Sequence, residues 1–154
     1  MKLSVMLEQL SSGMLRSMEI FFLTLIFSLP LGLLISFGRM SKNKILRTII
    51  KVYISVMRGT PLMLQLLVVY FGPYYLFGMQ IGGTYRFTAI ILGFALNYAA
   101  YFAEIYRSGI ESMPVGQYEA ARVLGYSKAQ CFCCIIFPQV VKRILPSITN
   151  EVIT

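Results

Sequence analysis

Three long stretches without a charged residue constrain this chain most strongly, and they cover residues 20–38, 59–85 and 87–103. A helix needs about 20 apolar residues to cross the hydrocarbon layer of a bilayer. The first stretch is long enough. The third is slightly short, so we expect its helix to continue past Glu104. The second exceeds one span and is interrupted at Gly72-Pro73 and Gly82-Gly83. With 57% hydrophobic and 13% charged residues, the chain has the composition of an integral membrane protein.

We therefore predict an all-α integral membrane protein that forms one domain over residues 1–154. The spans are expected at about residues 20–38, 61–77 and 87–107, and the start of a fourth near residue 145. In the second of these, Thr60 is expected to cap the helix that Pro61 opens. Residues 112–138 would form a polar loop between the third and fourth spans. The first stretch is too long, and too far from the N-terminus, to be a cleaved signal peptide.

The distribution of charge predicts the orientation in the membrane. Six basic residues, with no acidic residue among them, lie between the first two stretches: Arg39, Lys42, Lys44, Arg47, Lys51 and Arg58. The positive-inside rule places this segment in the cytoplasm and the N-terminus outside. The turn over residues 78–86 is then external, and the loop over residues 112–138 is cytoplasmic. The net charge of +8 therefore indicates membrane topology, and its placement argues against nucleic-acid binding.

The same basic segment has the pattern of an amphipathic helix. Lys44, Arg47 and Lys51 share one helical face, whereas Ile45, Ile49 and Val52 lie on another. Helices of this type lie at membrane surfaces and are attracted to anionic lipid.

The polar loop carries local signals for two short helices. Pro114 can open the first, over residues 115–124, because a proline in the first turn loses no needed hydrogen bond. Gly125 suits the left-handed residue that ends a helix. Ser127 and Gln130 then form a capping box for a second helix. Pro138 is expected to mark the end of this second helix or to follow it closely.

Two short helices that meet at a glycine would make a compact knuckle. Ala120 and Ala121 would keep one side of it slim enough to enter a partner's groove. Glu119 and Arg122 would offer charge-assisted hydrogen bonds. An ordinary pair of amphipathic helices at the membrane surface is the alternative interpretation.

The spacing of residues in this loop resembles the EAA loop of ATP-binding-cassette (ABC) importer permeases. Glu119-Ala120-Ala121 is followed after three residues by Gly125, and after nine more by Ile135-Ile136-Phe137-Pro138. Phe137 is the one departure, because the family pattern has leucine there. The likeness extends to Arg58-Gly59-Thr60-Pro61-Leu62 with Gln65, and to residues 100–104 and 107–110. This likeness covers the chain from about residue 19. The chain is similar to the permeases for polar amino acids, the branch of the histidine, glutamate, glutamine, arginine and opine type.

The resemblance implies the class I ABC importer fold, a MetI-like helical bundle. Family members continue through the fourth span and one more, so we expect this chain to be incomplete at its C-terminus. Cys133 and Cys134 stand where many relatives carry a basic residue. The implied function is that of a membrane-spanning permease subunit in a prokaryotic plasma membrane. The residues implied to couple it to an ATPase are Gln117, Glu119, Ala120, Ala121, Arg122 and Gly125.

The implied partners are a dimer of ABC ATPase subunits, a second permease chain and an extracytoplasmic solute-binding protein. The second permease could be identical to this chain or different from it. We expect no catalysis in this chain, because it has no phosphate-binding loop, no histidine and no aspartate. No cofactor is expected, and Cys131, Cys133 and Cys134 provide too few ligands for a zinc site.

Polar residues on the third span are candidates for the substrate path. Asn97, Tyr101, Glu104, Ser108 and Glu111 recur on one helical face. Polar groups in a membrane usually face a bundle interior or a wet cavity. A carboxylate there could hold the ammonium group or cationic side chain of an amino acid, and Gln65 and Glu151 are further candidates. The alternatives are an ion pair of Glu104 with Arg107 and a helix-to-helix hydrogen bond of Gln65.

Two other functions remain open from the residues alone. An ion-coupled carrier or channel could use the same polar face, and a non-transporting membrane anchor would need no path. Which amino acid is carried is also open, because cationic amino acids, glutamine, cystine and glutamate are all compatible with these motifs.

Small residues at intervals of four predict where helices pack. Ser28, Gly32 and Ser36 form one such row, and Ala95, Ala99 and Ala103 form another. Small residues let helix backbones approach closely in lipid.

Overall fold

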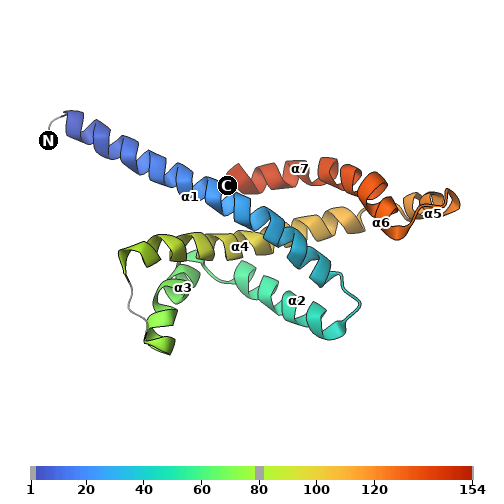
Figure 1. Ribbon diagram of the computed structural model, residues 1–154, viewed down its shortest axis with the longest axis horizontal. Helices are drawn as coiled ribbons and strands as arrows, with labels where there is room; N and C mark the ends of the chain where they lie inside the picture. Colours follow the sequence, from blue (N-terminus) through green and yellow to red (C-terminus); the bar gives the residue numbers. More distant parts are fainter. Residues whose placement is uncertain (1–2, 79–81, 154) are drawn as a thin grey trace.

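The computed structural model describes residues 3–78 and 82–153, and helices make up nearly all of this part (Figure 1). In chain order they are α1 (Leu3–Arg39), α2 (Lys44–Gly59), α3 (Leu62–Phe77), α4 (Gly83–Glu111), α5 (Val115–Val123), α6 (Lys128–Gln130), the π-helical segment η1 (Cys131–Ile136) and α7 (Phe137–Ile153). The described residues contain no strand. The prediction of an all-α protein is therefore confirmed. The centre of the turn predicted at residues 78–86 lies outside the described residues.

Three helical runs among the described residues are long and apolar enough to cross a membrane. They are α1, the part of α4 over Tyr85–Glu111, and the continuous run Lys128–Ile153. Helices α2 and α3 pass the same test only as a pair, and the pair is bent by 113°. The predicted spans at residues 20–38 and 87–107 fall within α1 and α4, and the one at residues 61–77 coincides with α3 except for Pro61. Residue 145, where a fourth span was expected to begin, lies inside a helix that starts at Lys128.

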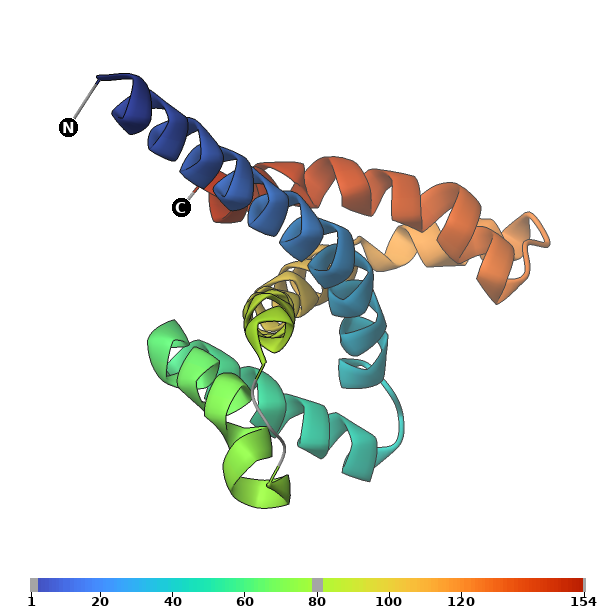
Figure 2. The same ribbon diagram turned by 60° about the vertical axis from the view of Figure 1, so that its left-hand side comes forward.

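Helix α4 is the central element of the bundle. It contacts α1, α2, α3 and α7. Figure 2 views α4 nearly end-on, with α1 and α7 on one side of it and α2 and α3 on the other. At one end of the bundle α5, α6 and η1 project beyond the start of α2. At the other end the N-terminal part of α1 projects alone (Figure 1).

The predicted rows of small residues form the contact between α1 and α4. Ser28, Gly32 and Ser36 are all buried on α1. A Cβ atom added to Gly32 would lie 2.8 Å from the Cβ of Phe102, 3.1 Å from the carbonyl oxygen of Ala99 and 3.2 Å from the amide nitrogen of Ala103. Only glycine leaves room for the two backbones to meet at this point.

The start of α3 differs from the expectation. The cap of α3 is Pro61, which makes no side-chain hydrogen bond to the helix, so the prediction that Thr60 caps it is wrong. The hydroxyl of Thr60 instead donates to the carbonyl of Val56 at 2.8 Å, and it accepts from Nε2 of Gln65 at 2.8 Å. Thr60 thus belongs to the sharp bend between α2 and α3.

The expectation that Pro138 marks the end of a helix is also wrong, since the helix continues to Ile153. A proline inside an α-helix lacks an N–H and clashes with the carbonyl four residues earlier. The preceding turns are π-helical here, and the amide of Phe137 donates to the carbonyl of Phe132, five residues back. The side-chain amide of Gln139 donates to the carbonyl of Ile135 at 2.9 Å. This wider turn admits the proline without ending the helix.

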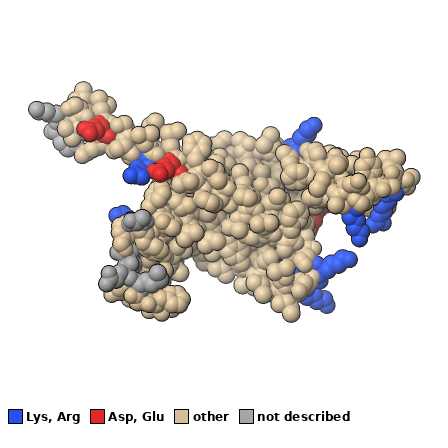
Figure 3. Space-filling model, viewed as in Figure 1, with Lys and Arg blue, Asp and Glu red and all other residues tan. Residues whose placement is uncertain are grey.

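Basic side chains gather at the end of the bundle that carries α5 and the start of α2 (Figure 3). The predicted basic segment and the polar loop therefore lie at the same end. This placement is what the positive-inside argument requires of two segments on one side of a membrane.

Replacement of Gly32 by alanine should destabilise the bundle, although alanine is normally the better helix former. The added methyl group would press on backbone atoms of α4, and such overpacking typically costs about 1–3 kcal/mol. Gly13→Ala is the matched control on the same helix, because nothing lies within 4 Å of its Cβ position. Thermal unfolding in detergent should show a lower midpoint for Gly32→Ala and an equal or higher one for Gly13→Ala. Equal midpoints would contradict the close contact.

Candidate functional site

The knuckle, which we define as residues 113–136, has the local structure that its sequence predicts. Helix α5 begins after Pro114 and ends in a pair of hydrogen bonds, from the amide of Gly125 to the carbonyl of Arg122 and from that of Tyr126 to the carbonyl of Ala121. This Schellman arrangement requires a left-handed residue, and Gly125 has φ of +77°. Ser127 and Gln130 then form the complete capping box at the start of α6. These predictions of local structure are confirmed.

The inner side of the knuckle is fixed by its own hydrophobic core. The buried members of this core are Met113, Ala121, Cys131, Ile136, Val140 and Ile144, which come from α5, η1, α7 and the turn before α5. Ala121 is only 1% exposed. The expectation that both alanines form the slim outer side is therefore wrong for Ala121, which packs inward, whereas Ala120 is exposed.

The outer side of the knuckle presents both polar and apolar groups. Gln117, Glu119, Ala120, Arg122 and Gly125 are all exposed. Val123 and Leu124, at the tip, are 88% and 72% exposed. An apolar tip flanked by charged side chains is the composition expected of a surface that another protein covers. The sequence prediction missed Val123 and Leu124, although their position directly before Gly125 places them at the tip.

The knuckle is tied firmly to α4 and α7. Nη1 of Arg143 donates to the carbonyl of Ser112 at 2.6 Å, and Nε2 of Gln139 lies 3.4 Å from Oε1 of Gln117. A Cβ atom on Gly109 would collide with the side chain of Ile144. The α4–α7 packing is therefore close just beside the knuckle, and α7 should follow any rotation of the knuckle.

A cavity of about 440 Å³ opens between α2, α4 and α7. Its polar lining is Arg58, Tyr101, Glu104, Ser108, Ser112, Arg143, Ser147 and Glu151. Four of the residues proposed for the substrate path thus lie together, namely Tyr101, Glu104, Ser108 and Glu151. The cavity also contains cations that the sequence prediction did not assign to it, Arg58 and Arg143. Arg58 could have been anticipated from its place just before the break at Gly59.

The acidic and basic groups of this cavity are unequally paired. Arg107 binds both Glu104 and Glu111, so the alternative interpretation of Glu104 as an ion-pair partner holds in the structure. Arg58 lies over the ring of Tyr101, with 5.1 Å from its Cζ to the ring centroid. Within the described residues, Glu151 has no ion pair. Glu151 is therefore the carboxylate whose charge is still available to a ligand.

Gln65 and Asn97 lie outside this cavity, at the bend between α2 and α3. The side-chain amide of Asn97 donates to Oε1 of Gln65 at 2.8 Å and to the carbonyl of Met57 at 3.1 Å. Nε2 of Gln65 donates to the carbonyls of Met57 and Thr60, at 2.9 and 3.1 Å. These bonds satisfy the free carbonyls at the end of α2. The helix-to-helix hydrogen bond considered for Gln65 is therefore present, and the pair fixes the bend.

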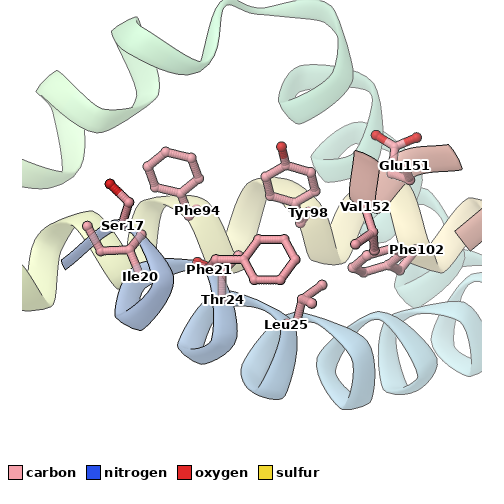
Figure 4. A pocket seen from close by; sticks show the side chains of 10 residues that line it. All are labelled: Ser17, Ile20, Phe21, Thr24, Leu25, Phe94, Tyr98, Phe102, Glu151 and Val152. Atoms are coloured by element: carbon pink, nitrogen blue, oxygen red, sulfur yellow. The ribbon is translucent and has the colours of Figure 1, made fainter. Parts of the chain in front are cut away.

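A second, smaller cavity of about 210 Å³ lies between α1, α4 and the end of α7 (Figure 4). Its lining is mainly apolar and aromatic, with Phe21 of α1 and Phe94, Tyr98 and Phe102 of α4. Glu151 lines this cavity as well as the larger one. The end of α7 therefore forms part of the wall between the two.

Comparison with known proteins supports the resemblance to importer permeases that the sequence indicates. Residues 28–154 match the family model described as binding-protein-dependent transport system inner membrane component. A Rickettsia bellii protein that carries the name of a glutamine transport system permease, GlnP, is 39% identical over 144 residues, which are 92% of this chain and 63% of that protein. The arginine transport system permease protein ArtQ of Bacillus subtilis is 40% identical over 142 residues, which are 92% of this chain and 64% of ArtQ. The chain thus spans a little under two thirds of the length of these relatives.

A solved structure shares the fold. The crystal structure of an amino acid ABC transporter with histidines matches with a TM-score of 0.81 and 38% identity, over 99% of this chain and 71% of that chain. The resemblance in sequence therefore extends to the whole described arrangement of helices.

Substitutions at Gln65 and Asn97 should reveal the coupling at the bend. Gln65→Leu and Asn97→Leu should each lower stability by about 1–3 kcal/mol, because each removes a hydrogen-bond partner from the buried or half-buried amide of the other. The double variant should lose less than the sum, by about 0.5–3 kcal/mol, in denaturant unfolding from detergent. Gln65→Leu with Gln139→Leu is the control pair, and these distant sites should be additive. Additivity at Gln65 and Asn97 would show that the bond between them contributes nothing.

Proposed function

The chain belongs to the family of binding-protein-dependent transport system inner membrane components, and we propose that it acts as the membrane-spanning permease subunit of an ATP-driven importer for polar amino acids. The single observation that carries this proposal is the knuckle, a rigid two-helix element that projects from the bundle beside the basic end. The names of its relatives, which include glutamine and arginine transport permeases, favour polar amino acids. They do not agree on one substrate.

The partners follow from this assignment. A separate pair of ATPase subunits would bind the knuckles in the cytoplasm, through Gln117, Glu119, Ala120 and Arg122 and the apolar tip. A second permease chain would complete the path, and an extracytoplasmic solute-binding protein would deliver the substrate. The clustering of basic side chains at the knuckle end supports a cytoplasmic knuckle in a prokaryotic plasma membrane, with the N-terminus of the chain outside (Figure 3).

The contacts of Arg143 support a mechanical route from the knuckle to the cavity. Arg143 holds Ser112 at the base of the knuckle and also lines the cavity. Glu151 lies two turns further along the same helix, α7. When the ATPases close and move the knuckle, α7 would move with it and carry Arg143 and Glu151. The cavity would then change its shape and its charge distribution together.

The charges of the cavity are suited to a zwitterion. Glu151 could accept hydrogen bonds from the ammonium group of an amino acid, because it has no competing ion pair among the described residues. Arg58 or Arg143 could bind the carboxylate of the same molecule. Glu104 forms an ion pair with Arg107, so we assign to Glu104 the secondary role of setting the charge of the cavity wall. Tyr101 and Ser108 would add hydroxyl groups to the same wall, whereas Gln65 and Asn97 support the path from outside it.

Bulk added to the outer side of the knuckle should uncouple ATP hydrolysis from transport. Ala120→Trp would obstruct a groove on the ATPase, and Gly125→Val would disrupt the left-handed turn that orients α5. In the assembled complex in vesicles, uptake should fall at least about tenfold while ATP hydrolysis persists. Leu76→Trp adds similar bulk to an exposed site at the end of α3 and should transport normally. Normal uptake in both knuckle variants would exclude this mechanism.

Neutralisation of Glu151 should weaken substrate capture. In Glu151→Gln the KM for uptake should rise about tenfold or more, because a charge-assisted bond to the ammonium group is lost. Glu104→Gln should have a smaller effect, and Glu19→Gln, whose carboxylate pairs with Arg16 outside the cavity, should have none. The measurement is initial uptake by the reconstituted complex. An unchanged KM in Glu151→Gln would remove this residue from the path.

A further inference from the structure

The start of α2 carries a group of basic side chains that the transport mechanism does not use. Lys42, Lys44, Arg47 and Lys51 are exposed, and none of them has an ion pair within the described residues. No acidic residue occurs between Glu19 and Glu104. We call these four residues the basic corner. In Figure 3, Lys and Arg side chains are grouped at this end of the bundle.

The basic corner is held in a fixed arrangement. The side-chain oxygen of Asn43 accepts from the amides of Ile45 and Leu46 and so defines the first turn of α2. Lys44, Arg47 and Lys51 then follow at intervals of three and four residues, along one face of the helix. The face that packs on the bundle is a different one and includes Ile50, Tyr53 and Ile54.

An exposed apolar strip lies on the remaining face of α2. It consists of Ile45, Ile49, Val52 and Val56, which are all at least half exposed. The strip and the three basic residues of α2 lie on separate faces of the same helix, about 100° apart between Lys44 and Ile45 and between Lys51 and Val52. Exposed aliphatic groups beside unpaired cations match the two chemical parts of a phospholipid, the acyl chain and an anionic headgroup.

We propose that the basic corner and this strip form a binding site for anionic phospholipid. The headgroup phosphate would contact Lys44, Arg47 and Lys51, and the acyl chain would lie against Ile45, Ile49 and Val52. An acidic surface of a partner protein would also attract the cations, but it would leave the four aliphatic side chains without an apolar neighbour. The knuckle, which projects further from the bundle, is the separate surface for the ATPase (Figure 1). The chain would therefore select lipids by charge at the membrane surface beside α2.

The absence of tryptophan from the chain makes this site directly testable. Ile49→Trp introduces a single tryptophan into the strip. The purified chain would be reconstituted in phosphatidylcholine vesicles that contain a small fraction of brominated phosphatidylglycerol or, in parallel, of brominated phosphatidylcholine. Bromine quenches tryptophan only at short range, so the ratio of the two quenching efficiencies reports local lipid selection. We expect brominated phosphatidylglycerol to quench about fivefold or more efficiently than brominated phosphatidylcholine. This factor is the preference for anionic lipid that one basic residue near the surface contributes.

Four controls isolate the contribution of the basic corner. Ile26→Trp on α1 has almost the same exposure as Ile49, at 62% against 61%, but it lies in a charge-free segment and should give a ratio near one. Adding Lys44→Gln, Arg47→Gln and Lys51→Gln to Ile49→Trp should also bring the ratio near one. Lys44→Arg with Lys51→Arg should preserve it. High salt should reduce the selectivity, since it screens exposed charges.

Two results would overturn the proposal. One is equal quenching by the two brominated lipids in Ile49→Trp, and the other is a preference that survives the triple substitution. If equal quenching were combined with loss of ATPase binding in the triple variant, the basic corner would belong to a protein interface. Because the measurement requires neither ATP nor any partner chain, its outcome is independent of the proposed transport function.

Discussion

The close contact between α1 and α4 is the interaction on which the rest of the structure depends. In a bilayer, apolar side chains gain little by leaving lipid for a helix interface, so helices associate through close packing and hydrogen bonds. Gly32 allows the backbone of α1 to reach Ala99 and Ala103 directly. Helix α4 is thereby held in the centre, where it can also contact α2, α3 and α7. The cavity, the bend and the base of the knuckle are all built on this one helix.

A second constraint is that polar groups must find partners wherever the helices are interrupted. At the bend between α2 and α3, Gln65 and Asn97 bind the carbonyls that end α2. At η1, the amide of Gln139 binds a carbonyl beside the wide turn. Both interruptions are therefore joints held by specific hydrogen bonds. A permease needs such joints, because its helices must change direction without exposing unsatisfied backbone to lipid.

Local signals allowed much of the structure to be predicted from the sequence. The end of α5 at Gly125 and the capping box at Ser127 involve residues close together in the chain, and both predictions are confirmed. The rows of small residues were also predicted, because their spacing is a property of a single helix. The gathering of Tyr101, Glu104 and Ser108 in one cavity agrees with their common helical face.

The features that sequence reasoning missed depend on contacts between distant segments. A helix-to-helix hydrogen bond of Gln65 was expected as one alternative, but its partner was not, because Asn97 lies 32 residues away and no periodicity within either helix indicates the pairing. Ala121 turns inward because α7 and η1 pack over it, which the motif alone does not reveal. Pro138 is tolerated because the preceding turn is wider than an α-helical one, a departure that residue preferences do not encode.

The π-helical turn also sets the angular phase of α7. A π-turn accommodates one residue more than an α-turn, and one residue corresponds to about 100° of rotation around a helix axis. If the same number of residues wound as an ordinary α-helix, the following helix would be rotated by about 100° relative to the knuckle. Arg143 and Glu151 would then point away from the cavity even though both were still present. The wide turn therefore keeps both side chains directed at the cavity despite its extra residue, and a single deletion inside it should be better accepted than a single deletion within α7.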